Sequence, residues 1–284
     1  MKYSILPNLS REGAKELTEK ICIKLNELGA ECVLPVQYNE LFKNVSFAEN
    51  EDEAVKLSDA VIAVGGDATI IHAAKRAVTF GKPVLGINSG RLAFMAGLED
   101  HELDLLKCLI TGEYNLDRRL ILKARIFNGE KELSCDYCIN DVYVSSDSGP
   151  RMEEINVYLG DKLVDSYLCD GILVATPTGS TAYSLSAGGS VVDPELESIL
   201  LTPVCSHSLF NRPIIFRPDS VVTIKSYSDK PLRVSLDGQD FMIIEPGCKA
   251  VVERAESKAE FIRIKNDNFI DILSTKLAHR KELK

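Results

Sequence analysis

Long apolar runs are absent from this 284-residue sequence. None approaches the roughly 20 residues that a helix needs to cross a bilayer. Residues 1–7 hold only a very short apolar stretch, which is typical of a first strand rather than of a secretion signal. The sequence therefore predicts a cytoplasmic protein without a membrane partner.

Basic clusters are scarce as well. The formal net charge is −9, and the basic clusters are short, such as Arg118-Arg119 and residues 280–284. An acidic surface repels nucleic acid and anionic membranes, so we expect neither as a partner. A small polyanion is compatible with this charge if backbone N–H groups, a few cations and a divalent metal hold it locally.

The two common nucleotide fingerprints are also missing. The sequence contains no G-x-x-x-x-G-K-[ST] run and no pair of glycines in a G-x-G arrangement. These absences exclude a P-loop and the usual dinucleotide fingerprint. A protein of this sequence that binds ATP or NAD does so through another motif.

Eight cysteines are present, but no metal-binding set accompanies them. Most stand in helical or strand-like patterns, where a free thiol behaves as a small buried hydrophobe. Cys135 and Cys138 have C-x-x-C spacing without a second pair or a nearby histidine. We therefore interpret them as structural thiols rather than as a zinc or redox site.

The order of segments predicts an α/β domain followed by an all-β domain. In residues 1–115, short apolar runs at 3–6, 32–36, 60–64 and 83–87 alternate with helical patterns at 11–28, 69–78 and 103–110. Such alternation favours a Rossmann-like parallel sheet. Ser10 is the expected N-cap of the first helix, and Gly29 its stop.

Residues 116–266 are dominated by short β-forming segments separated by turn signals, which favours an antiparallel, sandwich-like β domain. A single helix is expected near 181–187. Residues 267–284 are expected to form a C-terminal helix that packs on the first domain. The β segments are expected at 121–127, 135–144, 155–158, 171–175, 221–226, 232–236, 241–244, 251–253 and 261–265.

The first chemical motif is Gly65-Gly66-Asp67-Ala68-Thr69, which directly follows a buried apolar strand and begins a helix. This position is the carboxyl end of a parallel strand, where open α/β sheets bind ligands. The glycines let a ligand approach the backbone, and the helix start favours phosphate. Asp67 could accept a proton or help to hold a metal; alternatively, it simply caps the helix.

The second motif spans residues 170–189 and carries the turn Thr176-Pro177-Thr178-Gly179-Ser180-Thr181 after an apolar strand. Four hydroxyl groups in six residues suit a phosphate or a hydroxyl-rich ligand, and Tyr183 offers an aromatic ring to a base. The alternative is an ordinary helix cap, for which one hydroxyl is enough.

These motifs resemble those of NAD kinases. G-G-D-x-T after a buried strand is shared with 6-phosphofructokinases and with diacylglycerol and sphingosine kinases. The run at 170–189 resembles a motif particular to NAD kinases, and residues 86–94 resemble their G-I-N-x-G-x-L-G-F segment. The motifs follow the family's order from about Val61 to Gln239, and the family's α/β domain plus β-sandwich matches the pattern above.

The resemblance implies transfer of the γ-phosphoryl group of ATP, or of polyphosphate, to the 2′-hydroxyl of the adenosine ribose of NAD, with a divalent metal, usually Mg²⁺. Asp67 is then the proton acceptor, and a homodimer or homotetramer is expected. The implied NAD-contacting positions are Ala68, His72, Phe94, Asn140, Asp141, Arg151, Asp170, Thr181, Ala182, Tyr183, Ser186 and Gln239. The implied phosphate-binding positions are Gly65, Gly66, Thr69, Thr178, Gly179 and Ser180.

Structural alternatives exist for several of these positions. The pair Asn140-Asp141 interrupts an apolar segment and could mark a turn or a strand edge. Arg151 could be a solvated surface residue. Gln239 follows Asp237-Gly238, a dipeptide that is primarily a hairpin signal.

The sequence departs from the family at four positions. Ala68 and Ala93 stand where the family usually has glycine, Asp141 where it has glutamate, and Leu168 where some members have arginine. Ala68 would crowd the phosphates if the family glycine serves close approach, or strain the turn if it serves a positive φ. Two other functions therefore remain open: a lipid or sugar kinase that shares G-G-D-x-T, and an NAD-binding regulator with weak catalysis.

Overall fold

The computed structural model describes residues 1–90, 93–147, 152–207, 211–227 and 230–274. Contacts divide the chain into two compact units. One contains residues 1–118 together with those from 259 onward, and the other contains residues 119–258. The domain limits at 115 and 266 expected from the sequence stay predictions.

A parallel sheet forms the centre of the first unit. Its strands are β1 (Lys2–Pro7), β2 (Glu31–Pro35), β3 (Ser46–Ala48), β4 (Ala60–Gly65) and β5 (Val84–Asn88). Their order is β3-β2-β1-β4-β5, and all neighbouring pairs among them run parallel. The order reverses between β1 and β4, so the loops that follow these two strands lie at a topological switch point, where ligands bind in open α/β sheets.

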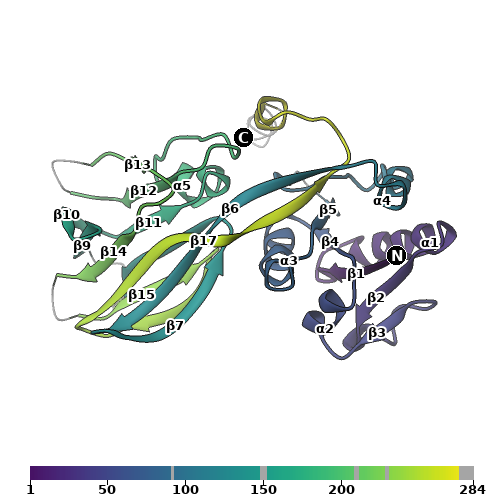
Figure 1. Ribbon diagram of the computed structural model, residues 1–284, viewed down its shortest axis with the longest axis horizontal. Helices are drawn as coiled ribbons and strands as arrows, with labels where there is room; N and C mark the ends of the chain where they lie inside the picture. The colour runs from purple at the N-terminus through teal and green to yellow at the C-terminus, as the bar shows by residue number, and fades with distance from the viewer. Residues whose placement is uncertain (91–92, 148–151, 208–210, 228–229, 275–284) are drawn as a thin grey trace. The chain divides into compact units, whose positions relative to one another are not determined.

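Helices flank this sheet. They are α1 (Ala14–Glu27), η1 (Val36–Tyr38), α2 (Glu51–Lys56), α3 (Asp67–Thr79), η2 (Leu103–Leu106) and α4 (Lys107–Thr111). The connections β1-α1-β2 and β4-α3-β5 run in opposite directions along the sheet, and right-handed crossovers then place α1 and α3 on opposite faces. In agreement, α1 contacts η2 whereas α3 contacts α2 (Figure 1).

The ends of α1 correct one expectation and confirm another. Its N-cap is Gly13, with φ +76°, and not Ser10, whose hydroxyl group instead donates to the Asn8 side chain. Gly29 stops the helix with φ +78°, as expected.

At the other end of the chain, residues 269–274 are helical, and the Asn268 side chain accepts from the backbone N–H of Asp271. The rest of the expected C-terminal helix lies outside the described residues.

The second unit is built almost entirely of strands. They are β6 (Asn115–Asn128), β7 (Lys131–Cys138), β8 (Asp141–Ser146), β9 (Glu153–Leu159), β10 (Lys162–Cys169), β11 (Gly171–Ala175), β12 (Ile199–Val204), β13 (Ile214–Phe216), β14 (Val222–Ser226), β15 (Leu232–Leu236), β16 (Gln239–Ile244) and β17 (Cys248–Arg263). Strands β6 and β17 also carry the chain from one unit to the other, and Phe261 near the end of β17 pairs in parallel with Val84 of β5.

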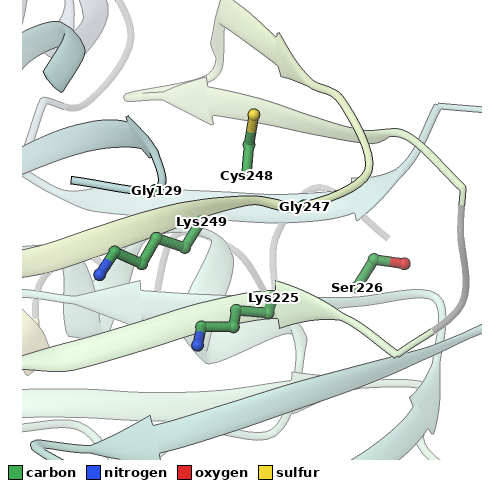
Figure 2. Close-up of a pocket in the computed structure, with 6 residues that line it drawn as sticks. All are labelled: Gly129, Lys225, Ser226, Gly247, Cys248 and Lys249. Atoms are coloured by element: carbon green, nitrogen blue, oxygen red, sulfur yellow. The ribbon is translucent and has the colours of Figure 1, made fainter. Parts of the chain in front are cut away.

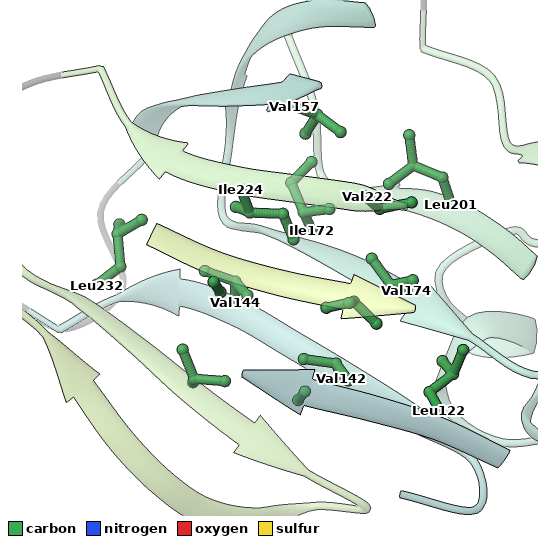
Figure 3. Close-up of a cluster of buried hydrophobic side chains, with 14 of the residues drawn as sticks. Leu122, Val142, Val144, Val157, Ile172, Val174, Leu201, Val222, Ile224 and Leu232 are labelled. Atoms are coloured by element: carbon green, nitrogen blue, oxygen red, sulfur yellow. The ribbon is translucent and has the colours of Figure 1, made fainter. Parts of the chain in front are cut away.

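Two sheets enclose the core of the second unit. One has the order β13-β12-β11-β8-β15-β16 and is antiparallel throughout. The other contains β10-β9-β14-β17, and β6 pairs with both β17 and β7. Alternate side chains of the two sheets meet in a buried apolar cluster, of which Val142, Ile172, Val157, Val222 and Ile224 are examples (Figure 3). This arrangement confirms the predicted sandwich-like β fold.

Several segment predictions were wrong in detail. The run at 135–144 is two strands, because the chain leaves β7 at Cys138 and enters the other sheet at Asp141. Strands β10, β12 and β13 were missed, and the helix expected at 181–187 is only η3 (Thr178–Thr181) followed by α5 (Tyr183–Ser186). Periodicity cannot predict helical pieces as short as η3 and α5.

The cysteines are free, and six of the eight are buried. Cys135 is exposed although Cys138 is buried, so the two thiols of the C-x-x-C pair have different surroundings. Among the described helices, none has the length and apolar character that crossing a membrane requires.

Candidate active site

Asp67 is the first residue of α3, directly after the turn that ends β4. Its carboxylate accepts hydrogen bonds from the backbone N–H groups of Phe94 (2.9 Å) and Met95 (2.8 Å), one at each oxygen. Gly66 is the N-cap of α3. The alternative that Asp67 merely caps its helix is therefore wrong. The carboxylate is half-buried and fixed in orientation, and each oxygen keeps a lone pair for another partner.

Arg263 supports the segment that holds Asp67. Its guanidinium donates to the backbone carbonyl groups of Ala96 (3.1 Å) and Met95 (3.3 Å), while its Nε donates to Asp117 at 3.1 Å. The side chain is only 15% exposed. The last part of β17 therefore fixes, through the backbone of residues 94–96, the direction in which the Asp67 carboxylate points.

The two glycines before Asp67 are required by close neighbours. A Cβ on Gly65 would lie 2.3 Å from the Thr69 hydroxyl oxygen, and one on Gly66 would lie 2.7 Å from an Arg11 guanidinium nitrogen. The guanidinium Cζ and the second terminal nitrogen would lie at about the same distance from that Gly66 Cβ, 3.0 Å each. Arg11 therefore lies face-on against the turn.

Sequence reasoning treated Arg11 only as a helix start and missed its place in the site. In the described part of the chain, no hydrogen bond or ion pair involves its guanidinium group, so its charge is available at the turn. Its position in the chain could have indicated this role. Arg11 is a cation in the loop after β1, and this loop begins at the same edge of the sheet as the loop after β4. The free N–H groups at the start of the 13-residue α3 add to the positive potential there.

The structure answers one question about the alanines. Neither Ala68 nor Ala93 is among the described non-glycine residues with positive φ. Ala68 lies in the first turn of α3 with its side chain exposed, and Ala93 is buried. The explanation by backbone strain, offered for Ala68, is therefore wrong, and only the effect of the added methyl group remains.

His72 lies one turn along α3 and takes part in a charged group with α2. Its Nε2 is 3.0 Å from a carboxylate oxygen of Glu51, and the Nε of Arg76 lies 2.6 Å from the same Glu51 oxygen. Arg76 also pairs with Asp52. The hydrogen bond with His72, followed by the charge of Arg76, lowers the pKa of Glu51. The His72 ring is 43% exposed, so it remains accessible to a ligand.

Asn140 and Asp141 lie where the chain passes from β7 to β8, which agrees with the turn or strand-edge interpretation of this pair. Asn140 is half-buried and Asp141 is 4% exposed. Neither side chain has a hydrogen-bond partner in the described part of the chain. Burial, and then the nearby charge of Asp237, raise the pKa of Asp141 to about 7.

The turn of the second motif is buried, and its hydroxyl groups bind the protein itself. Thr176 Oγ1 donates to the Ile139 carbonyl at 2.7 Å, and Ser180 Oγ donates to the Val192 carbonyl at 3.2 Å while accepting from the Val192 N–H at 3.0 Å. Thr178 Oγ1 accepts from Arg119 at 3.4 Å. These hydroxyl groups fix the shape of the turn. A phosphate contact at Thr178, Gly179 or Ser180 stays a prediction.

The other predicted NAD contacts of the second unit differ in accessibility. Thr181, Ala182 and Asp170 are half-buried, and Ser186 and Gln239 are exposed. The Tyr183 ring is 43% exposed and packs edge-on against Tyr143, with ring centroids 5.2 Å apart. The Tyr143 hydroxyl donates to the Asp170 carbonyl at 3.4 Å. Arg151 lies outside the described residues.

One hollow in the second unit has no predicted site residue. It encloses about 200 Å³ and is lined by Gly129, Lys225, Ser226, Gly247, Cys248 and Lys249. Figure 2 shows the Lys225 and Lys249 side chains extending in the same direction, whereas Cys248 points away from them. Both amines lie over aromatic rings, of Tyr158 and Phe127 respectively. Neither motif contributes a residue to this hollow.

The first unit thus holds an oriented carboxylate beside a glycine turn and a cation, at the switch point of a parallel sheet. The second unit presents an unpartnered amide and carboxyl group on an antiparallel sandwich. Such features are compatible with a phosphotransferase that acts on a nucleotide.

Comparison with known proteins gives a consistent result. The ATP-NAD kinase N-terminal domain model matches residues 10–114, and the ATP-NAD kinase C-terminal domain model matches residues 139–264. An NAD kinase of Caldanaerobacter subterraneus subsp. tengcongensis is 34% identical over 281 residues, covering 98% of this chain and 99% of that protein. An NAD kinase of Acetivibrio thermocellus is 31% identical over 289 residues, covering 99% of each. The chain belongs to the NAD kinase family.

Two solved structures share the fold. Yeast NADH kinase complexed with NADH superimposes with a TM-score of 0.89 at 23% identity, covering 98% of this chain and 87% of that one. An NAD kinase from Archaeoglobus fulgidus in complex with ATP gives a TM-score of 0.72 at 24% identity, covering 96% and 99%. The alternative of a lipid or sugar kinase is not supported, because both relatives described above match over nearly the full chain and are NAD kinases.

Proposed function

We propose that this protein transfers the γ-phosphoryl group of ATP to the 2′-hydroxyl of the adenosine ribose of NAD, with Asp67 as the proton acceptor. The observation that carries the proposal is the orientation of the Asp67 carboxylate by the N–H groups of Phe94 and Met95. A base that is held in place by backbone donors need not reorganise when the proton arrives.

The reaction that we propose is a single displacement. The ribose 2′-oxygen forms a bond to the γ-phosphorus, its proton passes to Asp67, and the bond between the γ-phosphorus and the bridging oxygen breaks, with its electron pair leaving on ADP. Positioning and charge stabilisation supply most of the acceleration in phosphoryl transfer. Arg11 and the first N–H groups of α3 are the donors that we assign to the phosphates of ATP, or of polyphosphate.

A divalent metal, Mg²⁺ in our proposal, fits this site. Mg²⁺ keeps several waters and usually binds through one or two carboxylates together with substrate phosphates. Among the described residues, no three His, Cys, Asp or Glu side chains form a group that could hold a metal alone. We therefore assign the ion to the substrate phosphates and water, and keep Asp67 as the proton acceptor. When bound, Mg²⁺ neutralises charge on the phosphates.

We assign the dinucleotide to the second unit. An amide and a carboxyl group without partners, on Asn140 and Asp141, suit the hydrogen-bonding groups of adenine and ribose. Tyr183, in the second motif, offers an exposed aromatic ring. Contacts of NAD with His72, Phe94, Asp170, Thr181, Ala182, Ser186 and Gln239, a homodimeric or homotetrameric assembly and a cytoplasmic location complete the proposal.

The purified protein, incubated with NAD, ATP and Mg²⁺, is expected to form NADP at a rate that depends on each component. NADH in place of NAD, and polyphosphate in place of ATP, define the acceptor and donor preferences in the same assay. Tight NAD binding without NADP formation would show a regulator instead of a kinase. Absence of both binding and turnover would contradict the proposal outright.

A further inference from the structure

The hairpin turn between β15 and β16 contacts the Asn140-Asp141 segment directly. The Asp237 carboxylate accepts from three consecutive backbone N–H groups, those of Ile139 (3.0 Å), Asn140 (2.7 Å) and Asp141 (3.3 Å). Its own N–H donates to the Asp141 carbonyl at 3.0 Å. Consecutive N–H groups that point at one carboxylate form an anion-binding nest, here occupied by a side chain of the protein.

The carbonyl groups of the same segment are bound from the second motif. The Thr176 N–H donates to the Asn140 carbonyl at 2.8 Å, and the Thr176 hydroxyl donates to the Ile139 carbonyl at 2.7 Å. The Gly179 backbone packs so closely against this segment that a Cβ there would lie 2.1 Å from the backbone carbonyl oxygen of Asn140. The N–H groups of the segment are therefore held by Asp237 and its carbonyl groups by Thr176, which leaves the backbone little freedom.

The side chains of this segment are left for another partner. Neither the Asn140 amide nor the Asp141 carboxyl group has a hydrogen-bond partner in the described part of the chain, although Asp141 is 4% exposed. A half-buried amide and a buried carboxyl group that have no protein partner are available to a ligand. The backbone is thus fully bound within the protein while the side chains remain free.

From these contacts we infer that Asp237 is a positioning residue, which fixes the Asn140-Asp141 segment so that its side chains can bind the nucleotide. The inference rests on the proposed function for the identity of the ligand, NAD. Burial of Asp141 raises its pKa, and the charge of Asp237 raises it further, which agrees with the proximity of the two carboxyl groups.

A turn role alone does not require this carboxylate. Asp237 and Gly238 have φ of +51° and +77°, values typical of a two-residue type I′ turn. Asparagine and glycine serve that turn equally well. The substitutions Asp237→Asn and Asp237→Gly therefore keep the hairpin. Asp237→Asn removes one of the two side-chain oxygens that accept from the three N–H groups, and Asp237→Gly removes both.

The test combines two measurements on the full-length protein. The first is amide hydrogen exchange, in which Asp237→Gly is expected to lose protection at Ile139, Asn140 and Asp141 while the amides of β15 and β16 stay protected. The second is NAD binding by calorimetry together with steady-state kinetics. We expect Kd and KM for NAD to rise about 10- to 100-fold in Asp237→Gly, and less in Asp237→Asn, with KM for ATP unchanged and a smaller fall in kcat.

A matched control is available in the hairpin between β9 and β10. Asp161 stands beside Gly160, which has φ of +57°, and is exposed. Asp161→Asn is expected to leave every parameter at the wild-type value. Wild-type exchange and NAD affinity in both Asp237 variants would overturn the inference and leave Asp237 as a turn residue. An equal fall in affinity for ATP and NAD would do the same, because it would show a general loss of structure.

The outcome is separable from that of the proposed function. If the wild-type protein failed to bind NAD, the proposed function would fall, and with it the ligand that we assign to Asn140 and Asp141. The exchange measurement would still decide whether Asp237 fixes the segment. If Asp237→Gly does not fold, Asp237→Asn decides both measurements, since it keeps a side-chain oxygen at the turn.

Discussion

The Asp67 carboxylate accepts a hydrogen bond at 2.8 Å from the backbone N–H of Met95, 28 residues further along the chain. The neighbouring Phe94 N–H binds the other carboxylate oxygen. This pair of contacts fixes the orientation of the carboxylate that we propose as the proton acceptor. It also determines what a substitution at Asp67 does to the structure.

Asp67→Asn is expected to lower kcat by roughly 10²- to 10⁴-fold while Kd for NAD changes little, because the proton acceptor is lost. The amide group must turn its –NH₂ toward one of the two N–H donors, so the free energy of unfolding falls by about 1–3 kcal/mol. Asp59→Asn, an exposed acid just before β4, is the matched control and is expected to retain full turnover. Normal turnover in Asp67→Asn would rule out the role assigned to this residue.

Ala68→Gly is expected to preserve or raise kcat/KM for ATP, because it removes an exposed methyl group at the start of α3 without changing a contact of the core. The loss of helix propensity lowers the free energy of unfolding by less than about 1 kcal/mol. Donor kinetics and chemical denaturation measure the two effects separately. A large loss of activity with ATP would show that the methyl group is adapted to the donor.

Arg11→Gln is expected to raise KM for ATP by roughly 10- to 100-fold, because a charge-assisted hydrogen bond to phosphate is lost, and to leave KM for NAD unchanged. Arg11→Lys keeps the charge but not the planar group that lies against Gly66, so we expect an intermediate value. Lys20→Gln, an exposed cation on α1, serves as the control. An unchanged KM for ATP would remove Arg11 from the donor site.

Asp141 predicts a dependence of stability on pH. Its pKa is about 7 in the folded protein, raised by burial and then by Asp237, against about 3.9 in an unfolded chain. A raised pKa contributes stability that is fully present below about pH 4 and is lost as the pH rises through 7. The reason is that the folded protein keeps the proton on Asp141 up to a higher pH than the unfolded chain does.

Denaturation of the wild type and of Asp141→Asn from pH 4 to pH 8 measures this contribution. The free energy of unfolding should decline with rising pH in the wild type relative to the variant, and the difference should become constant above about pH 8. Parallel curves for the two proteins would contradict the raised pKa.

Much of the fold followed from local patterns. The buried run at β4, the stop at Gly29 and the alternation of strands and helices predicted the parallel sheet because each signal is contained within a few residues. The boundary at Asn140 was harder to place. A polar pair inside an apolar run indicates an interruption, but not that the two halves enter different sheets.

The candidate site was predicted less completely. Asp67 could be proposed from its place after a strand, but its partners Phe94 and Met95 are distant in sequence and bind through backbone groups that carry no sequence signal. Arg11 and Asp237 were missed as parts of the site for the same reason. In the sequence, Arg11 indicates only a helix start and Asp237 only a turn. The fold places Arg11 against Gly66 and Asp237 against the Asn140-Asp141 segment.

The sequence by itself determined the class of chemistry, since the acid after a glycine turn and the hydroxyl-rich second motif are each contained within a run of consecutive residues. Only the tertiary structure decided which groups are free to act. It binds the Thr176 and Ser180 hydroxyl groups within the protein and leaves the Arg11, Asn140 and Asp141 side chains without partners in the described residues. The physical reason is that each polar group has a limited number of hydrogen bonds, and packing decides whether the protein or a ligand receives them.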